Sequence, residues 1–301
     1  IPTPSWVSYA PQAHILGRQV RWLQTRAVNG WRLTAEELER VGAEDPGRPR
    51  LVILNYPSNP TGDTLRTEDL KALARVARKY RMVVLSDEIY GELHHRGQHV
   101  SIARFYPEGT IVSSGLSKWC GAGGWRLGTF TFPRGLRWLL DAMAAVASET
   151  YTSTSAPIQY AAVRAFEGGT EIEEYLLHSR RVLRALGRSI AATLREHETE
   201  ILDPRGGFYL FPDFGPHRER LAARGIHTSR DLCERLLEEI GVAILPGTDF
   251  GRPEEELTAR MAYVNFDGAQ ALMGASQIPS DRPLDADFLE THCPSTLEAV
   301  H

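Results

Sequence analysis

Short apolar runs alternate with amphipathic stretches along the first two thirds of the sequence, and this alternation constrains the fold more than any other feature. The run Leu51–Leu54 ends in asparagine and proline, which is typical of a buried strand. Apolar residues then recur at helical spacing up to Tyr80, which predicts a helix capped by Thr67. By the same reasoning, strands are predicted at Met82–Leu85, Thr110–Ser114 and Gly128–Phe132, and helices at Leu136–Val146 and Pro157–Phe166. Such alternation favours an α/β fold, with a mostly parallel mixed sheet flanked by helices.

The pattern changes near residue 170. A long charged stretch with periodic apolar residues predicts one helix over Glu171–Glu198. Beyond it, strands are predicted at Gly206–Phe211, Val242–Leu245 and Ala259–Phe266, and a helix at Asp231–Ile240. We therefore expect a large domain over residues 1–170 and a smaller C-terminal α+β domain over residues 171–301.

Composition excludes several classes of protein. Lys and Arg number 34 against 38 Asp and Glu, and a formal charge of −4 disfavours a nucleic-acid partner. No apolar run approaches 18 residues, so we expect no membrane-spanning helix. The three cysteines (Cys120, Cys233 and Cys293) form no Cys-x-x-Cys pair, which disfavours a disulfide framework and favours a cytoplasmic location.

Polar segments follow three of the predicted strands, where ligands of a parallel sheet bind. They contain Asn59 in the turn Asn59–Gly62, Asp87 and Tyr90 after the second strand, and Lys118, with Arg126 eight residues further on. A lysine can form a Schiff base, an aspartate can pair with a cationic ring nitrogen, and an arginine can bind a phosphate. Together these residue types fit one cofactor, pyridoxal 5'-phosphate.

The segment GLSKWCGAGGWRLG, residues 115–128, matches the attachment-site pattern of a known family at every constrained position. On this segment the chain resembles the class I/II aminotransferases of the fold-type-I pyridoxal-phosphate superfamily, which are aspartate aminotransferase-like. The NPTG and Asp-x-x-Tyr segments precede it in the family's order. The segments PSW (residues 4–6) and PGTDFG (residues 246–251) and Arg260 in ARMAYVNFDG extend the resemblance over essentially the whole chain.

The resemblance implies a role for each matching residue near the cofactor ring. Lys118 would form the Schiff base and then act as the general base and acid that moves the substrate proton. Asp87 would pair with the pyridine nitrogen and keep it protonated. Tyr90 and Asn59 would hydrogen-bond the phenolic oxygen of the ring, and Asn59 would also contact the substrate.

The remaining matching residues would hold the ends of the cofactor and the substrate. Arg126 would bind the phosphate, with help from Ser114 or Ser117. Trp6 would stack on the ring face. Arg260 would bind the α-carboxylate of the substrate in a bidentate pair.

Two features depart from the family's pattern. Many relatives have a phosphate-binding serine three residues before the lysine, where this chain has Gly115. Relatives also have a domain-sized stretch before the PSW segment that supplies a strand, a phosphate loop and groups reaching the neighbouring subunit. We therefore expect the sequence to be a fragment, and the resemblance implies a homodimer.

The predicted function is a pyridoxal-phosphate-dependent aminotransferase that moves an amino group from an L-amino acid to a 2-oxo acid by a ping-pong mechanism. Two alternatives stay open: a lyase or cyclase of the same fold, and a non-catalytic module that senses the cofactor or an amino acid. Relatives specific for dicarboxylates have an extra arginine in the region around residues 148–151. No arginine occurs from Ser148 to Ile158, which disfavours aspartate or glutamate as the sole substrate class.

Other candidate sites have simpler interpretations. His94, His95 and His99 have no carboxylate or cysteine at metal-ligand spacing, so we expect a hydrophilic turn and no metal site. Cys120 has no histidine neighbour in sequence, and we expect it to serve packing.

Overall fold

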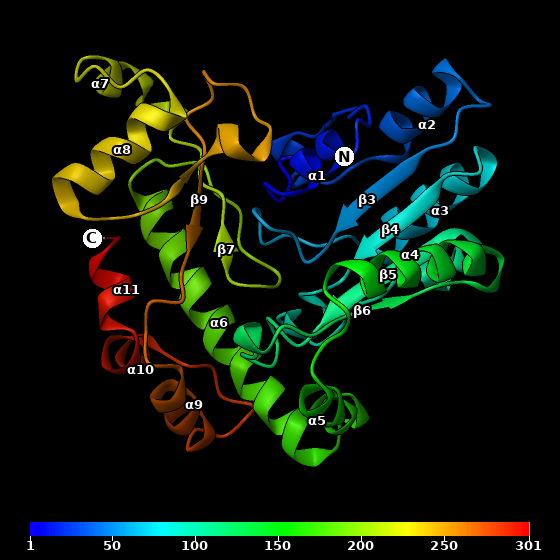
Figure 1. The fold of residues 1–301 in the computed structure, drawn as a ribbon. Coiled ribbons are helices and arrows are strands. Elements are labelled where there is room, and N and C mark those ends of the chain that lie inside the picture. The colour runs from blue at the N-terminus through cyan, green and yellow to red at the C-terminus, as the bar shows by residue number, and fades with distance from the viewer. Residues whose placement is uncertain (301) are drawn as a thin grey trace.

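The structure is a computed structural model that describes residues 1–300, and its strands form three sheets (Figure 1). The strands are β1 (Pro2–Thr3), β2 (Leu23–Gln24), β3 (Leu51–Asn55), β4 (Val83–Asp87), β5 (Thr110–Gly115), β6 (Gly128–Thr131), β7 (Tyr209–Leu210), β8 (Leu245–Pro246) and β9 (Ala259–Ala262). The helices are α1 (Tyr9–Ile15), α2 (Ala35–Glu44), α3 (Thr67–Lys79), α4 (Arg137–Thr150), α5 (Ala156–Glu167), α6 (Thr170–Glu196), α7 (Arg218–Ala222), α8 (Ser229–Ile240), α9 (Gly268–Ser276), α10 (Ala286–His292) and α11 (Pro294–Glu298).

The central sheet has the strand order β3-β4-β5-β6. The first three strands are parallel, whereas β6 runs antiparallel to β5. The predicted α/β fold, with a mostly parallel mixed sheet, is confirmed. The register pairs Asn55 with Asp87, and Asp87 with Ser113. Polar residues of three strands therefore lie side by side at the carboxyl edge of the sheet.

One face of this sheet is covered by α2 and α3. Alternate strand residues, such as Val52, Leu54 and Val84, are buried with Leu70 and Leu73 of α3 in one apolar cluster. This follows from the two-residue period of a strand and the 3.6-residue period of a helix.

The second half of the chain packs around α6. The apolar side of this helix is buried in a cluster that also contains residues of the small sheet, ordered β7-β9-β8, and of α9 and α10. In Figure 1 α6 runs past β7 and β9, with α9 beside its first half. The same cluster includes Tyr90, Leu116 and Trp119 from the first half, so apolar packing is continuous across residue 170. The division into two domains at that residue remains a prediction.

Four local predictions are wrong at element ends. The predicted strand Ala259–Phe266 is shorter than expected, since only Ala259–Ala262 forms β9. Thr67 does not cap α3; it is the first helical residue, and the backbone N–H and guanidinium of Arg66 bond the Asp69 carboxylate instead. The predicted strand Val242–Leu245 is displaced to Leu245–Pro246. Val242, the first residue of the predicted strand, instead caps the end of α8, because its N–H donates to the carbonyl of Leu236.

The predicted strand Gly206–Phe211 is also shorter than expected. Only Tyr209–Leu210 pairs with β9. The glycines that precede it form a turn, because Gly207 has φ +64° and the Gly206 N–H bonds the carbonyl of Gly62.

The histidine segment is not the hydrophilic turn that its composition suggests. His94 and His95 are buried, and the two ring nitrogens of His95 lie 3.2 Å from the Pro204 carbonyl and 3.0 Å from the Gly207 carbonyl. Burial lowers the pKa of His95 to about 4. His95 therefore joins the first half of the chain to the second. Residues 1–300 contain no group of three His, Cys, Asp or Glu side chains that could hold a metal ion. The same residues include no helix long and apolar enough to cross a membrane.

Truncation of Leu73 tests the packing of α3. We expect Leu73→Ala to lower the free energy of unfolding by about 2–5 kcal/mol, because the buried side chain leaves a cavity against the sheet. Urea unfolding measures this change. Arg75→Ala, on the exposed side of α3, is the control and should change the free energy by less than about 0.5 kcal/mol. Equal effects of the two substitutions would contradict the assigned packing.

Candidate active site

The candidate site lies at the carboxyl ends of β3, β4 and β5, because the predicted residues Asn59, Asp87 and Lys118 lie at or just after these strand ends. Asn55, the last residue of β3, joins two of these ends. Its side-chain amide donates to the backbone carbonyl of Asp87 (3.1 Å) and its side-chain oxygen accepts from the N–H of Asn59 (2.7 Å). Asn55 therefore holds the Asn59 turn against the end of β4. It was not among the predicted site residues, although it begins the sequence NYPSNPTG.

Asp87 is the half-buried carboxylate at the centre of the site. It accepts hydrogen bonds from the hydroxyl of Tyr9 and from the N–H of Ile89. Burial raises the pKa of Asp87, and the Tyr9 hydrogen bond opposes that rise. The carboxylate is thus poorly solvated and partly compensated, so a cationic partner would stabilise it.

Tyr9 was not predicted as a site residue. It lies three positions after Trp6, which is the only residue near the start of the chain that the sequence predicts as a site residue. The two rings meet edge to face with centroids 5.2 Å apart, and Trp6 is 38% exposed. Trp6 therefore borders the site, and Tyr9 lies between it and Asp87.

Lys118 approaches Asp87 and Tyr90 from the end of β5. Its Nζ lies 6.0 Å from the centroid of the Tyr90 ring, and its charge favours ionisation of Asp87. The other two lysines of the sequence, Lys71 and Lys79, form surface ion pairs with Glu68 and Glu39. Within residues 1–300, Lys118 forms no ion pair within 4 Å. Of the three lysine amines, only that of Lys118 forms no ion pair with a carboxylate of the described residues.

Arg260 reaches the site from the small sheet. Its Nη1 donates to the side-chain oxygen of Asn59 (3.3 Å). The guanidinium carbon lies 4.8 Å from the ring centroid of Tyr209 and 5.2 Å from that of Phe250. Its Nε is buried without a hydrogen-bond partner, and no carboxylate among the described residues pairs with Arg260. Such a guanidinium suits the carboxylate of a ligand.

The structure does not bring every predicted residue to this centre. Arg126 is exposed, has φ +57°, and donates to the Gly123 carbonyl (2.6 Å). Ser114 and Ser117 are half-buried. No hydrogen bond within residues 1–300 joins these three side chains to Lys118 or Asp87. Their role toward a phosphate therefore remains a prediction.

A second carboxylate, Glu88, adjoins Asp87 and has a different environment. It accepts hydrogen bonds from Ser86 (2.7 Å), Ser101 (2.5 Å), His99 (2.7 Å) and Tyr56 (3.4 Å). Burial opposes ionisation of Glu88, but the hydrogen bonds and the charge of His99 outweigh it and hold its pKa below the ordinary value. This network was also missed, because its members, from Tyr56 to Ser101, are separated by up to 45 positions in sequence.

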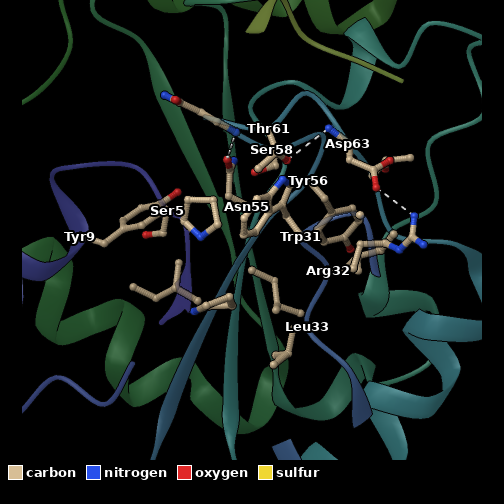
Figure 2. A pocket seen from close by; sticks show the side chains of 18 residues that line it. Ser5, Tyr9, Trp31, Arg32, Leu33, Asn55, Tyr56, Ser58, Thr61 and Asp63 are labelled. Atoms are coloured by element: carbon tan, nitrogen blue, oxygen red, sulfur yellow. Dashed lines mark hydrogen bonds and ion pairs between the residues drawn. The ribbon is translucent and has the colours of Figure 1, made fainter. Parts of the chain in front are cut away.

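A small cavity lies beside the Asn59 turn (Figure 2). Its volume is about 50 Å³, enough for water but too small for an aromatic cofactor. Figure 2 shows Ser5 and Tyr9 on one side of it and the Arg32–Asp63 ion pair, 2.9 Å long, on the other. The cavity separates the first residues of the chain from β3 and does not contain Lys118.

Comparison with known proteins adds an independent observation. Residues 1–267 match the family described as Aminotransferase class I and II. The chain is 35% identical over 267 residues to an aspartate aminotransferase of Geobacillus stearothermophilus, a match that covers 87% of this chain and 64% of the relative. It is 32% identical over 273 residues to an asparagine–oxo-acid transaminase of Streptococcus mutans, with the same two coverages. The chain thus spans slightly less than two thirds of the length of these relatives.

Solved structures give the same result. The aspartate aminotransferase from Thermus thermophilus with maleate superposes with a TM-score of 0.77 at 30% identity, over 91% of this chain and 67% of that one. An aromatic aminotransferase from Pyrococcus horikoshii superposes with a TM-score of 0.78 at 29% identity, over 92% of this chain and 70% of that one.

Substitution of Glu88 tests the hydrogen-bond network beside Asp87. We expect Glu88→Gln to reduce stability by about 1–3 kcal/mol at pH 7, because buried donors lose a charged acceptor. A carboxylate whose pKa is lowered by folding contributes stability above its unfolded pKa, and loses that contribution as the pH falls through its folded pKa. The difference in melting temperature between the two proteins should therefore shrink in acid.

The control for this measurement is Glu68→Gln, which changes an exposed carboxylate on α3. It should leave the melting temperature almost unchanged at every pH. A Glu88→Gln variant as stable as the unsubstituted protein at pH 7 would refute the network.

Proposed function

Because the chain belongs to the class I and II aminotransferase family, we propose that it is a pyridoxal 5'-phosphate-dependent aminotransferase acting on an L-amino acid and a 2-oxo acid by a ping-pong mechanism. One observation carries most of the proposal. Lys118, alone among the three lysines, is not ion-paired within the described chain, and it lies at the strand ends beside Asp87 and Tyr90. An amine must lose its proton to attack a carbonyl carbon, and an ion pair would hold that proton in place.

The residues present fit the ring end of the cofactor. Burial disfavours an isolated charge on Asp87, so its pairing with a protonated pyridine nitrogen would remove an electrostatic cost. When bound, the cofactor supplies an aldehyde for an amine and an electron-poor ring that stabilises negative charge at the substrate α-carbon. Tyr9 and the Ile89 N–H donate hydrogen bonds to the Asp87 carboxylate and would hold it in place for that ring.

The other residues would bind and orient. Lys118 would bond to the cofactor and move the substrate proton. Tyr90 and Asn59 would donate hydrogen bonds to the ring oxygen, and Trp6 would cover one ring face. Arg126 would bind the phosphate, with the Ser114 or Ser117 hydroxyl as its partner.

Arg260 would bind the α-carboxylate of the amino acid. Its buried Nε has no partner, and its Nη1 is positioned by Asn59. A bidentate pair with a carboxylate would satisfy the Nε and neutralise the guanidinium. The same contact would place the substrate next to Lys118 across the site.

The residues of the site define the side chain of the substrate less closely than its α-carboxylate. The relatives are named for aspartate, asparagine and aromatic amino acids. No arginine lies between Ser148 and Ile158, and we propose that the substrates are not restricted to dicarboxylic amino acids.

We also propose a cytoplasmic location, which the three cysteines without disulfide bonds support.

We propose a homodimer as the assembly. Large apolar side chains are exposed along α4 and α5, where water contact is unfavourable. They include Trp138, Val146, Tyr160 and Val163. Sedimentation equilibrium should give twice the mass of one chain, and Tyr160→Glu together with Val163→Glu should shift the protein toward the monomer. A wild-type monomer at micromolar concentration would refute the dimer.

Loading with pyridoxal 5'-phosphate tests the proposed function directly. We expect the purified protein to acquire visible absorption that is bleached by amino donors. After borohydride reduction, peptide mapping should find the cofactor on Lys118 and on neither Lys71 nor Lys79. Lys118→Ala should keep the fold but lose turnover by at least about a thousandfold, because the nucleophile and proton carrier are the same group.

Lys71→Ala is the matched control and should keep full activity. Product analysis distinguishes the reaction classes, since a transaminase releases a 2-oxo acid and an aminated acceptor whereas a lyase releases ammonia or a substituent. Full transaminase activity in Lys118→Ala would overturn the proposal.

A further inference from the structure

Tyr209 is a buried side chain that contacts two residues of the proposed site. It lies in β7 and is 7% exposed. Its hydroxyl is 3.2 Å from the hydroxyl of Tyr90, and its ring lies 4.8 Å from the Arg260 guanidinium. We propose that Tyr209 is a positioning residue that orients the Tyr90 hydroxyl toward the cofactor and the Arg260 guanidinium toward the substrate carboxylate. This inference rests on the proposed function.

The strand register places the ring of Tyr209 beside Arg260. Tyr209 pairs with Ala262 of β9, and Arg260 lies two residues earlier on that strand. Side chains two residues apart point to the same face, so Arg260 is a diagonal neighbour of Tyr209 within reach of a long side chain. Phe250 also contacts the guanidinium, at 5.2 Å from its ring centroid. Aromatic contacts on a planar cation restrict its orientation, which suits bidentate binding of a carboxylate.

The hydroxyl of Tyr209 contacts the second site residue, Tyr90. Tyr90 is buried and has a single hydroxyl proton. If Tyr90 donates that proton to the ring oxygen of the cofactor, its own oxygen must accept the proton of Tyr209. A hydroxyl that accepts a hydrogen bond becomes a stronger donor, because the two bonds polarise each other. Tyr209 therefore strengthens and orients the bond that Tyr90 would make.

These two contacts are chemically separable. Tyr209→Phe removes the hydroxyl and keeps the ring against Arg260. Tyr209→Leu removes both. Tyr106→Phe is the matched control, since Tyr106 is a buried tyrosine whose hydroxyl bonds the Met82 carbonyl (2.9 Å), outside the site.

The first measurement follows the visible absorption of the cofactor-loaded protein against pH. Weaker donation from Tyr90 disfavours the deprotonated form of the bound chromophore, so the midpoint of the titration should move to higher pH. We expect a rise of about 0.5 pH unit in Tyr209→Phe and in Tyr209→Leu, as for a loss of part of one hydrogen bond. The midpoint of Tyr106→Phe should not move.

The second measurement is the dissociation constant of maleate, a dicarboxylate without an amino group. We expect Tyr209→Phe to bind maleate within about twofold of the unsubstituted protein and Tyr209→Leu to bind it about threefold to thirtyfold more weakly, the range of one cation–π contact. Circular dichroism checks that each variant folds. Should Tyr209→Leu not fold, Tyr209→Met replaces it in this measurement.

The outcomes separate the inference from the proposed function. An unchanged pH midpoint in Tyr209→Phe would overturn the positioning role, and so would equal maleate affinities in the Tyr209→Phe and Tyr209→Leu variants. In either case, a visible band in the unsubstituted protein would still support the proposed function. An equal shift in Tyr106→Phe would also overturn the role, because it would show a general effect of lost buried hydroxyls. Absence of the band in the unsubstituted protein would refute the function and, with it, the inference.

Discussion

The carboxylate of Asp87 at the end of β4 is the constraint around which the site is arranged. Burial makes its charge unfavourable, so the surrounding groups must compensate it. Tyr9, the Ile89 N–H and the charge of Lys118 do so in part, and each comes from a different segment of the chain. Under the proposed function, a cationic ring bound beside Asp87 would complete the charge balance.

Two adjacent carboxylates show how the fold assigns different chemistry to similar residues. Asp87 and Glu88 are neighbours, yet the pKa of Asp87 is raised and that of Glu88 is lowered. Asp87 has one hydroxyl donor and lies toward the site, whereas Glu88 has four side-chain donors, including His99 and Tyr56. The first is available to a ligand, and the second attaches the segment around residues 99–101 to the sheet.

The proposed substrate end of the site comes from the second half of the chain. Arg260 is oriented by aromatic rings of the C-terminal half and by Asn59 of the first half. Asn59 in turn is held by Asn55 at the end of β3. At the site, this short series of hydrogen bonds adds to the apolar packing between the two halves, and a change in that packing would alter the orientation of Arg260 relative to Lys118.

The sequence by itself determined the alternation of strands and helices, the central sheet and the segments that contain Lys118, Asp87 and Asn59, because periodicity and motif spacing are local properties. It missed Tyr9, Asn55 and the Glu88 network, and it assigned no role to Tyr209. It also misjudged His95, whose ring is buried against carbonyls more than 100 positions away. Only the tertiary structure decided these partners, since burial and hydrogen bonding depend on which distant segments come into contact, and sequence pattern does not specify those contacts.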